Sequence, residues 1–218
     1  MGITRINIFS IILFTAVMAI ASPSQASQVN EVLLNSMSPY EDMIEYALAG
    51  KDSDVSKALI AADQHNKSVT TTLPAPAAQK FTAMMDALHK AVKHKKSNET
   101  AMYAVDIFRL LAENLQTDSL DVPREVSLLD YAGFRLRVLS ASRKPDWQDI
   151  RTTIDEAAGW WSVVKSKVST KGLSNTFDTL IHGLDTSAKT RDPYMLRFAA
   201  QMTLDLVDLL EGDLKSKR

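Results

Sequence analysis

Apolar residues recur every three or four positions along most of the chain, and polar residues fill the positions between them. This spacing places the apolar residues on one side of an α-helix, and no segment shows the sustained period-two alternation typical of strands. Glycine, proline and short polar runs separate the periodic segments. The pattern predicts a short helix at 29–36 followed by longer helices at 38–49, 52–69, 77–93, 97–115, 123–140, 146–168, 173–188 and 193–210. The predicted fold class is therefore all-α, a helical bundle of about eight main helices.

Two of the predicted helix starts carry recognisable signals. The sequence SPYE at 38–41 fits a capping box, in which the first and last residues cap each other's backbone, with proline at the first helical position. Asp192 followed by Pro193 combines an N-cap residue with proline at the same position. Both patterns predict a side-chain cap at the start of the helix.

The predicted helices form two groups on either side of the polar segment 116–122. The groups resemble each other, since FTAMMDAL at 81–88 aligns with FDTLIHGL at 177–184 and the order of helices and breaks is the same. The pattern predicts two tandem four-helix units, 27–117 and 123–218, related by a weak internal repeat. The alternative is that any two amphipathic helices align about this well.

The first 26 residues have the layout of a secretory signal peptide. Arg5 precedes an almost wholly apolar run at 8–21, and the small residues Ser24 and Ala26 fit a cut after Ala26. The apolar run is shorter than the roughly 20 residues that span a bilayer, although an uncleaved anchor is the alternative. We expect export, to the periplasm if the source is Gram-negative and by secretion otherwise. The mature chain would begin at Ser27 and carry no transmembrane span.

Composition narrows the range of functions. Cysteine is absent, which excludes disulfides, thiol catalysis, thiolate-bound metals and covalently attached c-type haem. Removing the first 26 residues leaves 24 basic and 26 acidic residues, a net charge of −2. A nucleic-acid-binding protein usually shows a basic excess on some element, so we expect no nucleic acid partner. The one basic cluster, at 90–96, lies at a predicted helix end, where cations favour the helix dipole; a phosphate-binding patch is the alternative.

Two pairs of residues resemble metal ligands. Asp86 with His89, and His182 with Asp185, stand three positions apart, which places each pair on one side of a helix. Such pairs suit zinc, copper or iron, and two pairs from duplicated helices would complete four ligands. However, Asp86 and His182 lie far from the apolar stripe of their helices, and His89 and Asp185 lie beside it. We therefore favour solvated surface pairs, with a metal site as the alternative.

Three methionines provide a second set of candidate ligands, in this case for haem iron. Met102, Met195 and Met202 lie in the last predicted helix of each half, and methionine is one of the side chains that bind haem iron. Methionine is also common as a flexible core residue, and this second interpretation is the one we favour.

Adjacent tryptophans form the most unusual stretch. Trp161 continues the apolar stripe of Ile150 and Ile154, so it is predicted to lie in the core. Trp160 lies about 80° from that stripe, and Gly159 beside it removes a side chain. Because exposed tryptophans favour interfaces, we predict that Gly159 and Trp160 contact a partner helix or an apolar ligand. The alternative is that Trp160 covers the edge of the core.

The sequence contains none of the nucleophile motifs or phosphate-binding loops that mark common enzyme classes. The resulting prediction is an exported, soluble, non-enzymatic helical binding or accessory protein. We expect no cofactor, and a partner that is an unknown protein or an apolar small molecule. The alternative function is a periplasmic metal- or haem-handling helical bundle.

Overall fold

The computed structural model describes residues 25–216 of the 218-residue chain. Most of the predicted signal peptide therefore lies outside the described residues. The described part consists of nine α-helices and one short 3-10 turn, without strands, which confirms the all-α prediction. The elements are α1 (Gln25–Asn35), α2 (Ser38–Leu48), α3 (Asp52–Thr72), α4 (Ala75–Lys93), α5 (Ser97–Glu113), η1 (Thr117–Ser119), α6 (Arg124–Ala141), α7 (Trp147–Lys165), α8 (Lys171–Thr190) and α9 (Pro193–Lys215).

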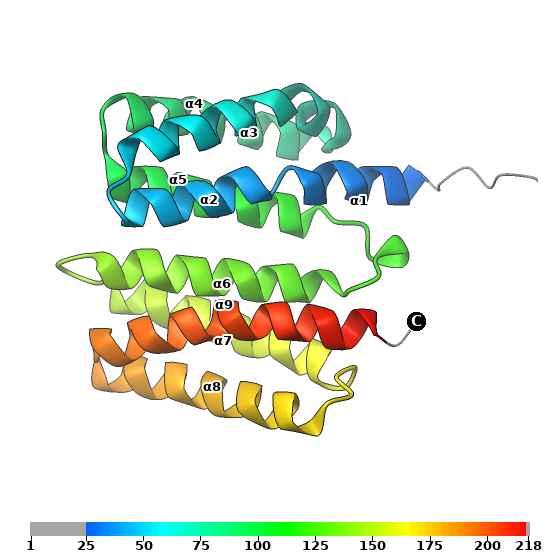
Figure 1. Ribbon diagram of the computed structural model, residues 1–218, viewed down its shortest axis with the longest axis vertical. Helices are drawn as coiled ribbons and strands as arrows, with labels where there is room; N and C mark the ends of the chain where they lie inside the picture. The colour runs from blue at the N-terminus through cyan, green and yellow to red at the C-terminus, as the bar shows by residue number, and fades with distance from the viewer. Residues whose placement is uncertain (1–24, 217–218) are drawn as a thin grey trace, which may run out of the picture.

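Helices α2–α5 and α6–α9 form two stacked groups (Figure 1). We call α2–α5 the first unit and α6–α9 the second unit. Within each unit the first helix packs against the second and the fourth, and the third helix closes the other side. The two units thus pair their helices in the same order. The internal repeat itself stays a prediction, because amphipathic helices of unrelated sequence pack in this way too.

Each unit has its own apolar core. The first core is built around Tyr40, Phe81 and Phe108, whose side chains are almost completely buried. The second core is built around Trp161 and Phe177, whose rings stack with their centroids 4.5 Å apart. Trp161 is buried, as predicted from its place in the apolar stripe.

Helix α6 belongs to both cores and joins the two units. One set of its side chains packs into the first core and another into the second. The first set is Leu128, Tyr131, Phe134 and Val138, and the second is Val126, Leu129, Ala132, Leu136 and Leu139. A helix that is apolar on opposite sides is buried on both, so the units share a continuous interior along α6.

Gly133 sets how closely α6 approaches α9. A Cβ atom at this position would lie 2.6 Å from Cδ2 of Leu204 and 2.9 Å from its Cγ. Any larger residue would push Leu204, and with it α9, away from α6. The close approach brings the polar edges of α6 and α9 together at the surface.

The prediction of a capping box at residues 38–41 is wrong. Helix α2 has Met37 as its N-cap in helical geometry, without a side-chain cap. Helix α1 precedes α2 with only one turn between them, and the backbone amides of Tyr40 and Glu41 donate to the carbonyl oxygen of Met37. The backbone itself therefore satisfies the first turn of α2. The cap at Asp192 is confirmed, since its side chain accepts hydrogen bonds from the amides of Tyr194 and Met195.

The predicted linker 116–122 is held against helix α1. Asn30 of α1 donates from Nδ2 to the carbonyl oxygen of Gln116 over 2.8 Å and accepts from the Gln116 amide over 2.7 Å. Asn30 also contacts the hydroxyl of Ser119, in η1, at 2.9 Å. The short α1 therefore fixes the connection between the units.

Within residues 25–216, no helix combines the length and the apolar character that crossing a membrane requires.

Candidate acidic binding groove

Helices α2, α6 and α9 run side by side on one face of the molecule (Figure 1) and enclose an open groove of about 470 Å³. Most of the side chains that line it are acidic. They are Glu41, Asp42 and Glu45 of α2, Asp130 and Phe134 of α6, and Gln201, Leu204, Asp205, Asp208 and Glu211 of α9. We call this surface the acidic groove.

Helical spacing explains how each helix contributes to the groove. Glu41 and Glu45 stand four positions apart on α2, and Asp205 and Asp208 stand three apart on α9. Residues at these spacings lie on one side of a helix. Each helix therefore turns its opposite side into a core while it presents a row of carboxylates to its neighbours.

Asp130 occupies the floor of the groove. It stands in the stretch LLDYAGF, where its neighbours on α6 enter one core or the other. A carboxylate inside an apolar stretch is unusual because burying its charge is costly. This lone aspartate is therefore a sequence signal for the groove, although it was not among the predicted site residues.

Some of the groove carboxylates have a local partner. Glu45 forms a bidentate ion pair with Arg137 of α6, with one nitrogen–oxygen distance of 2.9 Å. Asp205 accepts a hydrogen bond from Gln201, and Glu211 is paired with Lys215. Three of the seven carboxylates that line the groove therefore have a partner within residues 25–216.

Glu41 and Asp130 lack such partners. Among residues 25–216, no side chain donates a hydrogen bond to either carboxyl group or forms an ion pair with it. Both residues are only partly exposed, so water replaces the missing partners incompletely.

The two unpaired carboxyl groups hold their protons more tightly than usual. Burial, and then the charges of Asp42, Glu211 and Asp208, raise the pKa of Glu41 to about 7. Burial, followed by the charges of Glu41, Glu211 and Asp208, raises the pKa of Asp130 well above its ordinary value. Each group disfavours ionisation of the other, so a cation placed between them would favour the ionised form of both.

The opposite side of α6 shows how the same chain neutralises carboxylates. There the guanidinium of Arg135 pairs with Asp106 at 2.9 Å and with Asp149 at 2.8 Å. Arg109 forms equivalent pairs with Glu113 at 2.7 Å and with Glu156 at 2.8 Å. Four carboxylates at the α5–α6–α7 contact thus have two arginines between them, whereas the centre of the acidic groove has none in its lining.

The Asp/His pairs lie on the outermost helices of opposite units. Asp86 and His89 are exposed on α4, and Nε2 of His89 lies 2.9 Å from an oxygen of Asp63 on α3. His182 is exposed on α8, and Asp185 pairs with Lys189. Figure 1 places α4 and α8 at opposite ends of the stack, so the structure does not bring the two pairs together. In the described part of the chain, no three His, Asp or Glu side chains are grouped to hold a metal.

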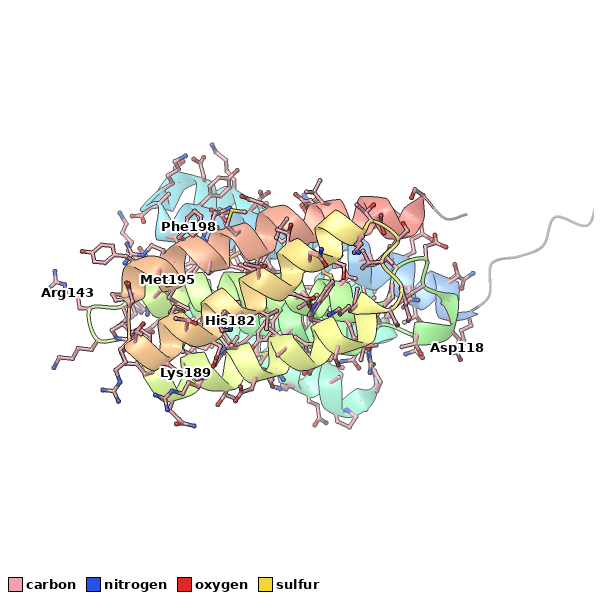
Figure 2. All side chains as sticks on the ribbon, turned by 90° about the horizontal axis from the view of Figure 1, so that it is seen from below. Asp118, Arg143, His182, Lys189, Met195 and Phe198 are labelled. Carbon is pink, nitrogen blue, oxygen red and sulfur yellow. The ribbon has the colours of Figure 1, made fainter. Side chains whose placement is uncertain are left out.

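The three methionines of the haem alternative are also separated. Met102 of α5 lies against Arg135, with 3.7 Å between its sulfur and a guanidinium nitrogen. Met202 of α9 packs at the edge of the second core. Met195, near the start of α9, is partly exposed at the surface (Figure 2).

Trp160 lies at the contact between the units. Its ring is partly buried, packs against both cores and meets the ring of Tyr131 edge-to-face with 6.0 Å between centroids. The guanidinium of Arg109 lies 6.0 Å from its ring centroid. Gly159 is exposed, and a Cβ atom there would meet nothing within 4 Å. A partner contact at Trp160 and Gly159 stays a prediction, on a side chain that already links the chain's own two units.

No protein-family model, curated protein or solved structure matches this chain.

Proposed function

We propose that this chain is an exported, non-enzymatic helical binding protein whose acidic groove binds a partner with several positive charges. The observation that carries the proposal is the pair Glu41 and Asp130, two partly buried carboxyl groups to which no cation of the described part of the chain is paired. A surface lined by charges of one sign attracts and concentrates ligands of the opposite sign. A cationic partner would supply the counter-charge that residues 25–216 do not place beside Glu41 and Asp130.

The groove lowers the stability of the folded chain, and this loss supports a binding function. Carboxyl groups that face each other without cations destabilise the folded chain through repulsion and desolvation. The chain places arginines where the α5–α6–α7 contact requires them, so it is able to neutralise carboxylates. Destabilising arrangements of this kind concentrate at functional sites, because a bound ligand offsets the lost stability.

The spread of the carboxylates favours a partner with more than one charge. They come from three helices, and Asp205 to Glu211 alone extends about 9 Å along α9 at 1.5 Å per residue. A polyamine or a lysine-rich segment matches such a spread because its charges are distributed along a chain.

Titration with oligolysine tests the groove directly. We expect the mature chain to bind oligolysine in calorimetry at low ionic strength, and binding to weaken as salt screens the charges. Asp130→Asn should weaken binding at least about tenfold, because losing one partner of a buried charge contact costs about 2 kcal/mol or more. Asp86→Asn is the matched control, since it removes one exposed carboxylate on α4. Equal affinity of the wild type and the Asp130 variant would contradict the groove as the site.

Export is supported by the charged start, apolar run and small residues of 1–26. We expect the chain recovered from the exported fraction to begin at Ser27, which intact mass spectrometry determines. Recovery of the full-length chain in the membrane fraction would contradict export in soluble form.

A further inference from the structure

Helix α9 carries an apolar stripe that the rest of residues 25–216 leaves uncovered. Phe198 is 69% exposed, Leu209 59% and Met195 38%, and Met202 between them is only partly buried. On a helical wheel these four residues fall within about 60°. Large exposed apolar patches rimmed by polar residues mark interaction sites on soluble proteins. We call Met195, Phe198, Met202 and Leu209 the α9 stripe.

The spacing of the α9 stripe suits another helix. Its residues stand three, four and seven positions apart, as apolar residues do along helix–helix contacts. From Met195 to Leu209 the stripe is about 21 Å long at 1.5 Å per residue. This length matches a partner helix of about four turns.

The two edges of the α9 stripe differ. Along one edge lie Asp205 and Asp208, which also line the acidic groove. Along the other lies α8, where Gly183 leaves room beside the methyl group of Met195, 4.0 Å from where a Cβ would be. Figure 2 shows Phe198 on the edge of α9 away from α8 and Met195 nearer to the helix that carries His182. An acidic edge next to apolar surface is complementary to a helix with a basic edge next to an apolar face.

We infer that α9 docks an amphipathic helix with a basic edge. The apolar face of the partner covers the α9 stripe, and its lysine or arginine side chains reach across Asp205 and Asp208 toward Asp130. This inference rests on the proposed function for its charged half, since it assigns the same groove to a protein partner. It adds the apolar half, which a free polyamine would not need.

Three peptides of equal length and net charge separate the two halves. The first is a leucine–lysine peptide with all leucines on one helical face, the second is its scrambled sequence, and the third replaces leucine by serine. We expect the amphipathic peptide to bind the mature chain at least about tenfold more tightly than the other two, as a buried apolar anchor provides. We also expect it to become helical on binding, which circular dichroism detects.

Variants of the chain locate the contact. The double substitution Phe198→Ser and Leu209→Ser should remove the tenfold preference and leave the affinity for the serine peptide unchanged. Ile60→Ser, on α3, and Val163→Ser, on α7, are matched controls because both residues are exposed apolar side chains away from α9. Circular dichroism of each variant establishes that it is folded.

The outcomes that would contradict the inference are distinguishable. Equal affinity for all three peptides, reduced by Asp130→Asn, would overturn the apolar docking and leave the cation-binding groove in place. Absence of binding to any of them would overturn both proposals. A dimer of the mature chain in sedimentation that the Phe198 and Leu209 substitutions dissociate would make a second copy the occupant of the α9 stripe, and would overturn the inference.

Discussion

At the scale of single residues, the carboxyl groups of the acidic groove should lower the free energy of unfolding. Glu41 has an ordinary pKa of 4.5 that rises to about 7 in the folded chain. The folded state therefore binds more protons than the unfolded state between these values, and the free energy of unfolding falls as pH rises from about 4.5 to about 7. Above that range the unfavourable contribution is constant. Asp130 acts in the same direction, since its pKa is raised too.

Neutral substitutions should consequently stabilise the chain. At pH 8, Asp130→Asn and Glu41→Gln should each raise the free energy of unfolding, by about 1 to 2 kcal/mol for Glu41→Gln, measured by urea denaturation. The gain from Glu41→Gln should shrink at pH 5, where the Glu41 carboxyl of the folded wild type, with its pKa of about 7, is largely protonated. Asp86→Asn, on an exposed carboxylate, should change stability at either pH by less than about 0.5 kcal/mol. Destabilisation by Asp130→Asn at pH 8 would show that its charge is satisfied.

Trp160 gives a second prediction at this scale. Its ring packs on both cores and on Tyr131, so Trp160→Ala should lower the free energy of unfolding by about 2 kcal/mol, less than for a fully buried tryptophan. Because Trp160 does not line the acidic groove, affinity for oligolysine should be unchanged. An unchanged melting temperature together with loss of a co-purifying partner would instead support the contact predicted for Gly159 and Trp160.

At the scale of elements, the two predicted helix starts behave differently. Asp192 accepts two backbone hydrogen bonds at the start of α9, at 2.9 and 3.1 Å. Ser38 does not act as the N-cap of α2, because the backbone of Met37 occupies that place. Asp192→Ala should therefore cost about 1 kcal/mol, and Ser38→Ala less than about 0.5 kcal/mol. Thermal denaturation of the two variants compares them, and an equal loss would contradict the difference in capping.

The connection between the units can be tested at the same scale. Asn30 of α1 holds the backbone and side chain of the 116–119 segment by several hydrogen bonds. Loops are cut by proteases when their backbone is free to leave the surface. Asn30→Ala should therefore speed cleavage within 116–122 in limited proteolysis, with Asn98→Ala, on an exposed asparagine of α5, as a control. Equal cleavage rates would mean that other contacts protect the segment.

At the scale of the whole molecule, α6 should make the two units unfold together. Its side chains complete both cores, so neither unit keeps its interior when the other unfolds. All three tryptophans, Trp147, Trp160 and Trp161, belong to the second unit, whereas circular dichroism reports on helices of both. We expect the fluorescence and circular dichroism transitions in urea to coincide. Separate midpoints would show that the units unfold independently.

The sequence by itself determined the helices, most of their boundaries and the core position of Trp161. These follow from periodicity and from turn and capping residues, which act over a few neighbouring positions. The exception is Ser38, which does not cap α2, because the preceding turn after α1 makes Met37 the N-cap.

Only the tertiary structure decided where the chain's charges meet. Glu41, Asp130 and Asp208 are far apart in sequence and form one groove because α6 packs between α2 and α9. The same packing gives arginines to the carboxylates on one side of α6 and none to Glu41 and Asp130 on the other. Electrostatic interactions depend on distance in space and on burial, and neither quantity is contained in the spacing of residues along a helix.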